Sequence, residues 1–158
     1  MATTIVPASM TVTITEAIVL NGQRQGGTNS KSFASIAEIS KRIVTVTVTE
    51  STIATFSAAV ASGNYIAASV RYIRFTNLDD TNFVTLTFRN QDNDEVALKL
   101  DAGQSFILNG DNANGMTAVL NATQDADAAS SANFGSLTNI QADADTASVD
   151  LEMFIASV

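Results

Sequence analysis

The sequence predicts an all-β fold, an antiparallel β-sandwich of about eight to ten short strands. Three observations predict it. Apolar and polar residues alternate with a period of two in several runs, β-branched residues fill these runs, and short segments rich in Asn, Asp and Gly separate them. Alternation of this kind places one row of side chains in a core and the other row in water or against a neighbour.

The clearest strands are expected within residues 71–108. The segment RYIRFTNLDDTNFVTLTF predicts a β-hairpin with a polar turn around residues 77–82. VALKL (96–100) and AGQSFIL (102–108) follow as two further strands. The inward row of the predicted hairpin consists of Ile73, Phe75, Val84, Leu86 and Phe88.

The first part of the chain predicts four strands and one long polar loop. We expect a flexible N-terminal arm at residues 1–9, followed by a single β-sandwich domain at residues 10–158. The expected elements are a strand at 11–20, a polar loop at 21–31, strands at 33–39 and 42–50, and a strand at the start of 51–61 that gives way to a loop through SGNY (62–65).

The last third of the chain alternates loops and strands. The expected elements are a turn-rich loop at 109–115, a strand at 116–122, a loop at 123–136, a weak strand at 136–142 and a clear final strand at 147–155. Eight antiparallel strands in two sheets form a jelly roll, which limits exposed sheet edges. An immunoglobulin-like sandwich is the alternative, although its Cys and Trp markers are missing from this sequence.

The composition argues against catalysis. The chain has no Cys, His or Trp, which excludes disulfides and thiolate metal sites and removes the side chain best suited to proton transfer near neutral pH. We therefore expect no enzyme activity, no cofactor and no metal. The first ten residues lack the basic and apolar regions of a signal peptide, and no apolar run is long enough for a membrane helix.

Acidic pairs are the only clusters that could carry chemistry. They occur at Asp79-Asp80, at 92–95, at 125–127 and at 143–145. Such oxygen clusters can hold calcium, and paired carboxylates can hydrolyse glycosides, but turn geometry is the favoured interpretation. The Gly-rich segments NGQRQGG and NGDNANG lack the context of phosphate-binding loops and are interpreted as turns.

Charge is unevenly distributed along the chain. Residues 1–99 hold all 8 Lys and Arg against 8 acidic residues, and residues 100–158 hold the remaining acidic residues, so the net −8 falls on the C-terminal part. This charge disfavours nucleic-acid binding. Only 15% of the residues are charged, below the roughly 25% of typical domains, which suits repeated protein–protein contact. We expect a homo-oligomer.

The candidate interface combines the outward row of the predicted hairpin with the N-terminal arm. Tyr and Arg are enriched at interface hot spots, and an apolar arm could reach a neighbouring subunit. An ordinary solvated sheet face remains the alternative. The candidate residues are Tyr72, Arg74, Thr85, Thr87, Ile5 and Val6.

Three segments resemble a known family. RYIRFTNLDDTNFVTLTF, then VALKLDAGQSFIL, then SVDLEMFIAS are similar to segments of small β-rich accessory virion proteins of tailed bacteriophages, of the marine or cyanophage type. The resemblance implies a jelly-roll-like structural protein, made in the host cytoplasm, that decorates or cements the exterior of the capsid. It also implies major capsid protein or other virion proteins as partners, a homo-oligomer with a trimer favoured, and no nucleic acid or membrane contact.

Two alternative functions also fit the sequence. The protein could be a head-fibre or tail component that contacts the host surface, or a carbohydrate-binding β-sandwich module. If it is a decoration protein, we expect the acidic C-terminal part to face solvent and the neutral N-terminal part, with its arm, to dock on the particle.

Overall fold

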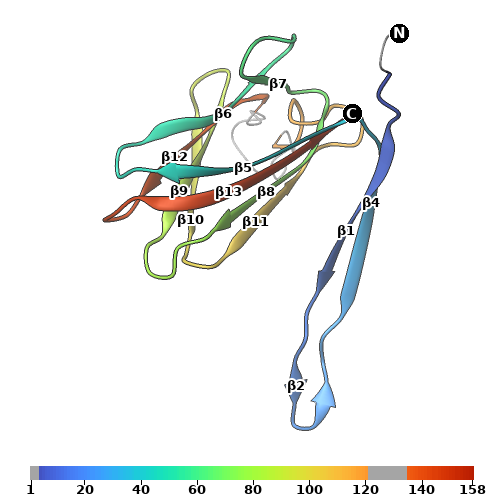
Figure 1. Ribbon diagram of the computed structural model, residues 1–158, viewed down its shortest axis with the longest axis vertical. Helices are drawn as coiled ribbons and strands as arrows, with labels where there is room; N and C mark the ends of the chain where they lie inside the picture. The colour runs from blue at the N-terminus through green and yellow to red at the C-terminus, as the bar shows by residue number, and fades with distance from the viewer. Residues whose placement is uncertain (1–3, 121–134) are drawn as a thin grey trace, which may run out of the picture. The chain divides into compact units, whose positions relative to one another are not determined.

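The computed structural model describes residues 4–120 and 135–158 (Figure 1). Within these residues all regular elements are β-strands, which confirms the predicted all-β class. No helix in the described part of the chain could span a membrane. The chain divides into two units, Met1–Glu38 together with Val158, and Ile39–Ser157. The structure thus places the boundary after Glu38, whereas the sequence led us to expect an arm at residues 1–9 and one domain beyond it.

The first unit is a long β-hairpin. Strand β1 (Ala8–Thr15) pairs antiparallel with β4 (Thr28–Ile36), and the short strands β2 (Val19–Leu20) and β3 (Gln23–Arg24) pair near the tip. At the tip, Asn21 and Gly22 both have positive φ, 50° and 77°. A two-residue Asn-Gly turn of this kind matches the twist of the flanking strands. The predicted polar loop at 21–31 is therefore wrong except at residues 25–27, because its other residues form this turn, β3 and the start of β4.

The second unit contains two sheets. The first has the order β11-β8-β13-β5, and the second has the order β10-β9-β12-β6-β7. The pairs β10–β9, β9–β12, β12–β6, β11–β8 and β8–β13 are antiparallel, whereas β6 and β7 pair in parallel. The strands are β5 (Glu38–Val46), β6 (Ser51–Ser57), β7 (Asn64–Ile66), β8 (Val70–Asn77), β9 (Val84–Asn90), β10 (Glu95–Leu100), β11 (Ser105–Asn109), β12 (Leu137–Ala144) and β13 (Val149–Ser157).

The core lies between these two sheets. The Phe88 ring on β9 and the Phe106 ring on β11 come from different sheets, and their centroids are 5.7 Å apart. Both sheets contribute fully buried side chains to one apolar cluster, so the unit is a β-sandwich. The cluster includes Val46, Ile53, Phe56, Ile73, Phe75, Leu86, Phe88, Ile140, Leu151, Met153 and Ile155.

The predicted hairpin at residues 71–88 is wrong, although both of its strands exist. Strand β8 pairs with β11 and β13, whereas β9 pairs with β10 and β12 in the other sheet. The inner rows of the two strands therefore face each other across the core instead of lying side by side in one sheet. An alternating pattern is the same in both arrangements, because it reports which side chains are buried and not which strand is the neighbour.

Asn77 holds the connections between the sheets. Its side chain is fully buried, and its Nδ2 donates to the backbone oxygens of Asn82 (2.9 Å) and Leu100 (3.1 Å). Its Oδ1 accepts a hydrogen bond from the backbone N–H of Asp79 at 2.9 Å, and its own N–H donates to the Gln104 oxygen. One residue thus satisfies backbone groups in the β8–β9 connection and at both ends of the β10–β11 connection.

Other predictions have mixed outcomes. Strand β12 confirms the weak strand at 136–142, and β13 confirms the final strand. The predicted strand at 116–122 is wrong over 116–120, which form turns around the buried Met116. Its last two residues, and residues 123–134 of the predicted loop at 123–136, lie outside the described residues.

Candidate assembly interface

One face of the β1–β4 hairpin carries a ladder of hydroxyl groups. The Oγ atoms pair across the two strands: Thr11 with Ser32 at 3.0 Å, Thr13 with Ser30 at 2.9 Å, and Thr15 with Thr28 at 3.3 Å. All three hydrogen bonds are exposed. This face is polar without charge, and its hydroxyl groups are already paired within the hairpin.

The opposite face of the hairpin is mainly apolar. On β1 it carries Met10, Val12 and Ile14, which stand opposite Phe33, Lys31 and Asn29 on β4. The Lys31 Nζ lies 5.8 Å from the centre of the Phe33 ring, at cation–π distance. Ile14 remains exposed. An isolated two-stranded sheet is marginally stable in water, so a hairpin with these faces is suited to contact with another surface.

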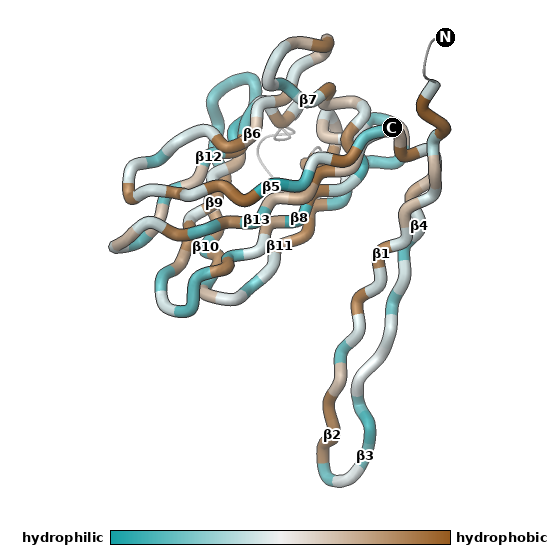
Figure 2. The backbone as a smooth tube through the Cα atoms, in the orientation of Figure 1, coloured by the Kyte–Doolittle hydropathy of each residue, from teal (hydrophilic) through white to brown (hydrophobic). Residues whose placement is uncertain are grey.

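The tip of the hairpin is an exposed apolar patch. Ile18, Val19 and Leu20 are 53%, 65% and 57% exposed, and Figure 2 shows the hydrophobic colour concentrated along β2. We call these three residues the apolar tip. The unit is electrically neutral, because Glu16 and Glu38 balance Arg24 and Lys31. The net −8 of the chain therefore belongs entirely to the residues after Glu38.

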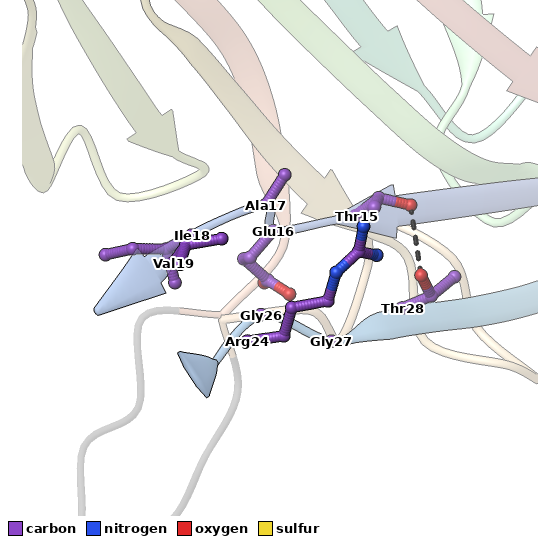
Figure 3. A pocket seen from close by; sticks show the side chains of 9 residues that line it. All are labelled: Thr15, Glu16, Ala17, Ile18, Val19, Arg24, Gly26, Gly27 and Thr28. Carbon is purple, nitrogen blue, oxygen red and sulfur yellow. Dashed lines mark hydrogen bonds between the residues drawn. The ribbon is translucent and has the colours of Figure 1, made fainter. Parts of the chain in front are cut away.

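Next to the apolar tip the hairpin opens into a pocket of about 470 Å³. Residues 15–19, 24 and 26–28 line it. Figure 3 shows the Arg24 side chain extending toward Thr15, and the Glu16 side chain turned toward Gly26. With one acid, one base, hydroxyls and apolar groups, the pocket could receive a side chain from a partner protein, but it contains no nucleophile paired with a base.

Gly26 allows the two strands to approach closely beside this pocket. A Cβ atom at this position would lie 1.9 Å from the backbone oxygen of Glu16. The ladder continues here through the Glu16 N–H, which donates to the Gly27 oxygen at 2.9 Å, and the Gln25 N–H, which donates to the Ile18 oxygen at 3.1 Å. The hairpin therefore requires glycine at residue 26.

In the second unit, the outer face of the β11-β8-β13-β5 sheet combines an ion-pair network with exposed apolar residues. Glu152 on β13 accepts from Arg74 on β8 at 2.5 Å and pairs with Lys41 Nζ on β5 at 3.0 Å. The hydrogen bond from Arg74 makes the largest contribution to a lowered pKa of Glu152, and Lys41 lowers this pKa further. On the edge strand β5, Ile39 and Ile43 flank Lys41 and are exposed.

The structure separates the predicted interface residues into two groups. Tyr72 and Thr87 are only 4% and 5% exposed, so the expectation that they form part of an open outward row is wrong. Burial raises the pKa of the Tyr72 phenol, and its ring packs edge-on against Phe154 at 6.0 Å. These side chains face away from the sandwich core but are covered, which alternation alone cannot reveal.

The remaining candidates are at least partly accessible. Arg74 and Thr85 are half-buried and lie on different sheets, so they do not form one patch. Ile5 and Val6, before β1, are 66% and 83% exposed. The apolar tip was not predicted from the sequence, although the Asn21-Gly22 dipeptide between two short runs is the usual signal for a hairpin.

The acidic loops serve mainly as turns. Asp79 Oδ1 accepts the backbone N–H groups of Asn82 (2.6 Å) and Thr81 (2.8 Å), and these bonds lower its pKa. Asp111 does the same with Asn114 and Ala113, and its pKa is lowered as well. Across residues 4–120 and 135–158, no group of three or more acidic side chains is placed to hold a metal ion. Asp125 and Asp127 lie outside the described residues.

Comparison with protein-family models, with curated proteins and with solved structures finds no match to this chain.

Proposed function

We propose that this protein is a structural virion protein of a tailed bacteriophage, a decoration or cement protein on the capsid exterior. The observation that supports it most is the neutral β-hairpin with its exposed apolar tip, joined in one chain to a strongly acidic β-sandwich. Such a chain offers a surface for protein contact and no constellation of catalytic groups among its described residues. The proposal includes no enzymatic activity, no cofactor, and no nucleic-acid or membrane partner.

The strand order supports a jelly-roll assignment. Without the short strand β7, the sandwich has eight strands. One sheet contains β5, β8, β11 and β13, and the other contains β6, β9, β10 and β12. Their spatial orders, β5-β13-β8-β11 and β6-β12-β9-β10, are those obtained when a long antiparallel ribbon wraps into two sheets. We infer that the sandwich is a jelly roll, the fold that the family resemblance implies.

In the proposed mechanism the hairpin docks on the particle and the acidic sandwich faces solvent. Docking buries the apolar tip against the major capsid protein or another virion protein. Apolar area removed from water contributes about 25 cal/mol per Å², and neutrality of the hairpin avoids electrostatic repulsion as it approaches. Each contact is modest, but many copies on one shell add their contributions through multivalency.

The test is a co-sedimentation assay with purified capsids that lack this protein. The double variant Val19→Ser/Leu20→Ser makes two of the three apolar tip residues polar, and the matched control is Val60→Ser, an 84% exposed apolar residue in a sandwich loop. We expect the tip variant to lose binding and the control to bind as the wild type does. Equal binding by all three proteins, or no binding by the wild type, refutes the proposal.

A second candidate function is glycan binding, as a host-contacting head-fibre or tail component or as a carbohydrate-binding module. The outer face of the β10-β9-β12-β6-β7 sheet favours it, because Asn139 and Gln141 stand at the centre among Thr55, Thr52 and Thr87. Within the described part of the chain, Asn139 Oδ1 and Gln141 Oε1 have no hydrogen-bond partner. Both oxygens are buried from solvent, so a sugar hydroxyl could donate to them only after the side chains that cover them move aside. Binding on a glycan array that Gln141→Ala abolishes would favour this candidate over capsid decoration.

A further inference from the structure

The free edge of β1 is a second feature of the hairpin that points to a partner. Among the described residues, β1 pairs with β4 alone, and the two form a two-stranded sheet. One edge of β1 therefore presents backbone groups without a neighbouring strand. Natural proteins usually protect such an edge with charged residues, proline or a bulge, because it is a template for pairing with another strand.

Strand β1 has almost none of this protection. Its eight residues, ASMTVTIT, include no charged residue and no proline, and β-branched residues dominate its second half. The single proline of the chain, Pro7, lies just before the strand, and the one irregularity of register is confined to Ala8–Met10. Along Met10–Thr15 the edge is regular, uncharged and rich in strand-forming residues.

The hydrogen-bond ladder shows which groups point to this edge. The Glu16 N–H donates to the carbonyl oxygen of Gly27, which directly precedes β4. From this pair back to Met10 the register of β1 against β4 has no shift. In an antiparallel pair, successive residues alternate between bonding their partner and pointing away from it. The N–H and C=O groups of Thr11, Thr13 and Thr15 therefore point away from β4, to the free edge.

We propose that β1 pairs antiparallel with β1 of a second copy of this chain, with Val12 opposite the partner's Val12. In this register Met10 lies opposite the partner's Ile14, so that the apolar row continues across both hairpins. On the other face, Thr11 lies opposite the partner's Thr13, which extends the hydroxyl ladder. The outward N–H and C=O groups of Thr11 then form hydrogen bonds with the C=O and N–H groups of the partner's Thr13, and the two-fold axis repeats these bonds.

Neighbouring registers are less favourable. A shift by one residue reverses the faces, so that apolar residues of one copy meet hydroxyls of the other. A shift that keeps the faces and sets Thr13 opposite the partner's Thr13 brings Met10 opposite the partner's Glu16 and loses one apolar pair. Because no charge lies on β1, no like-charge repulsion opposes pairing at the axis.

The contact uses the same surface on both copies, so it produces a dimer and not the trimer that the family resemblance implies. The paired hairpins form a four-stranded sheet in the order β4-β1-β1-β4. This inference does not rest on the proposed function, because it concerns self-association in solution. The apolar tip lies outside the paired residues and stays free to dock.

Two proline variants at one rung of the hairpin test the proposal. Thr13 and Ser30 stand opposite each other and share one hydroxyl hydrogen bond of 2.9 Å. By alternation both N–H groups point outward, Thr13 to the β1 edge and Ser30 to the β4 edge. Thr13→Pro and Ser30→Pro therefore both remove the hydroxyl hydrogen bond between these two side chains, and both leave the backbone hydrogen bonds between β1 and β4 intact. Only Thr13→Pro removes a backbone donor from the β1 edge.

The readout is sedimentation equilibrium over a wide range of protein concentration. We expect dimers for the wild type and Ser30→Pro, and an increase of about tenfold or more in the dimer dissociation constant for Thr13→Pro, since symmetry removes two hydrogen bonds at once. A monomeric wild type overturns the proposal. So does an equal effect of the two prolines, or weakening by Ser30→Pro alone, because the claim is specific to the β1 edge.

Amide hydrogen exchange gives a second readout that needs no variant. The N–H groups of Thr11 and Thr13 should become protected as the protein concentration rises and the dimer forms. Protection that is the same in dilute and concentrated samples contradicts the proposed pairing.

Discussion

Replacing Asn77 with alanine tests whether one buried amide holds the connections between the two sheets. The Leu100 carbonyl at the end of β10 loses its donor, and because Leu100 is only 3% exposed water cannot easily replace it. An unsatisfied buried group costs about 1–3 kcal/mol. The bonds to Asn82 and Asp79 involve half-buried residues that water reaches, so each contributes about 0.5 kcal/mol, at the lower end of the net range.

We therefore expect Asn77→Ala to lower the free energy of unfolding by about 2–4 kcal/mol. For a chain of this size the midpoint of thermal unfolding falls by roughly 2–4 °C per kcal/mol, which gives a decrease of about 4–16 °C. The assay is thermal unfolding followed by far-UV circular dichroism. Asn109→Ala, at an exposed position that ends β11, is the matched control and should change stability by about 0.5 kcal/mol or less. If the two variants unfold at the same temperature, the role assigned to Asn77 is refuted.

Three further predictions concern the ion-pair network, the hairpin and the core. The pKa of Glu152 is lowered in the folded state. Its contribution to stability is therefore fully present above the ordinary carboxyl pKa of about 4.3 and is lost as the pH falls through the lower folded-state value. Glu152→Gln should reduce this loss of stability at acid pH, as measured by denaturation curves at several pH values. Gly26→Ala would place a Cβ 1.9 Å from a backbone oxygen, so NMR should show loss of cross-strand contacts near the tip with an unchanged sandwich. Met116→Ala, at a fully buried position, should cost about 2–5 kcal/mol in urea unfolding, and a loss below that range would show that the turn at 116–120 packs loosely.

Much of the sandwich could be predicted from the sequence because burial and alternation are local signals. The β13 residues Val149, Leu151, Met153 and Ile155 alternate strictly and are all buried. Strand pairing is different, because the same alternating rows at Phe75 and Leu86 fit either a hairpin or two strands that face each other across a core. The buried Asn77, whose side chain joins the β8–β9 connection to the end of β10, looks in the sequence like an ordinary turn residue.

The candidate interface was only partly predictable. The exposed Ile5 and Val6 were expected near the N-terminus, and an apolar segment before the first strand is visible in the sequence. The apolar tip was missed because Val19 and Leu20 look like the end of one core strand when the following residues are taken as a loop. Tyr72 was misplaced for a related reason: a side chain directed away from the core can still be covered, and only tertiary structure reveals the cover.

Cryo-electron microscopy of virions purified from the native host tests the central claim most directly. We expect copies of the acidic sandwich on the outer capsid surface, with Ile18, Val19 and Leu20 in contact with a neighbouring virion protein. Intact virions in which mass spectrometry and the density map detect no copy of this chain would contradict it.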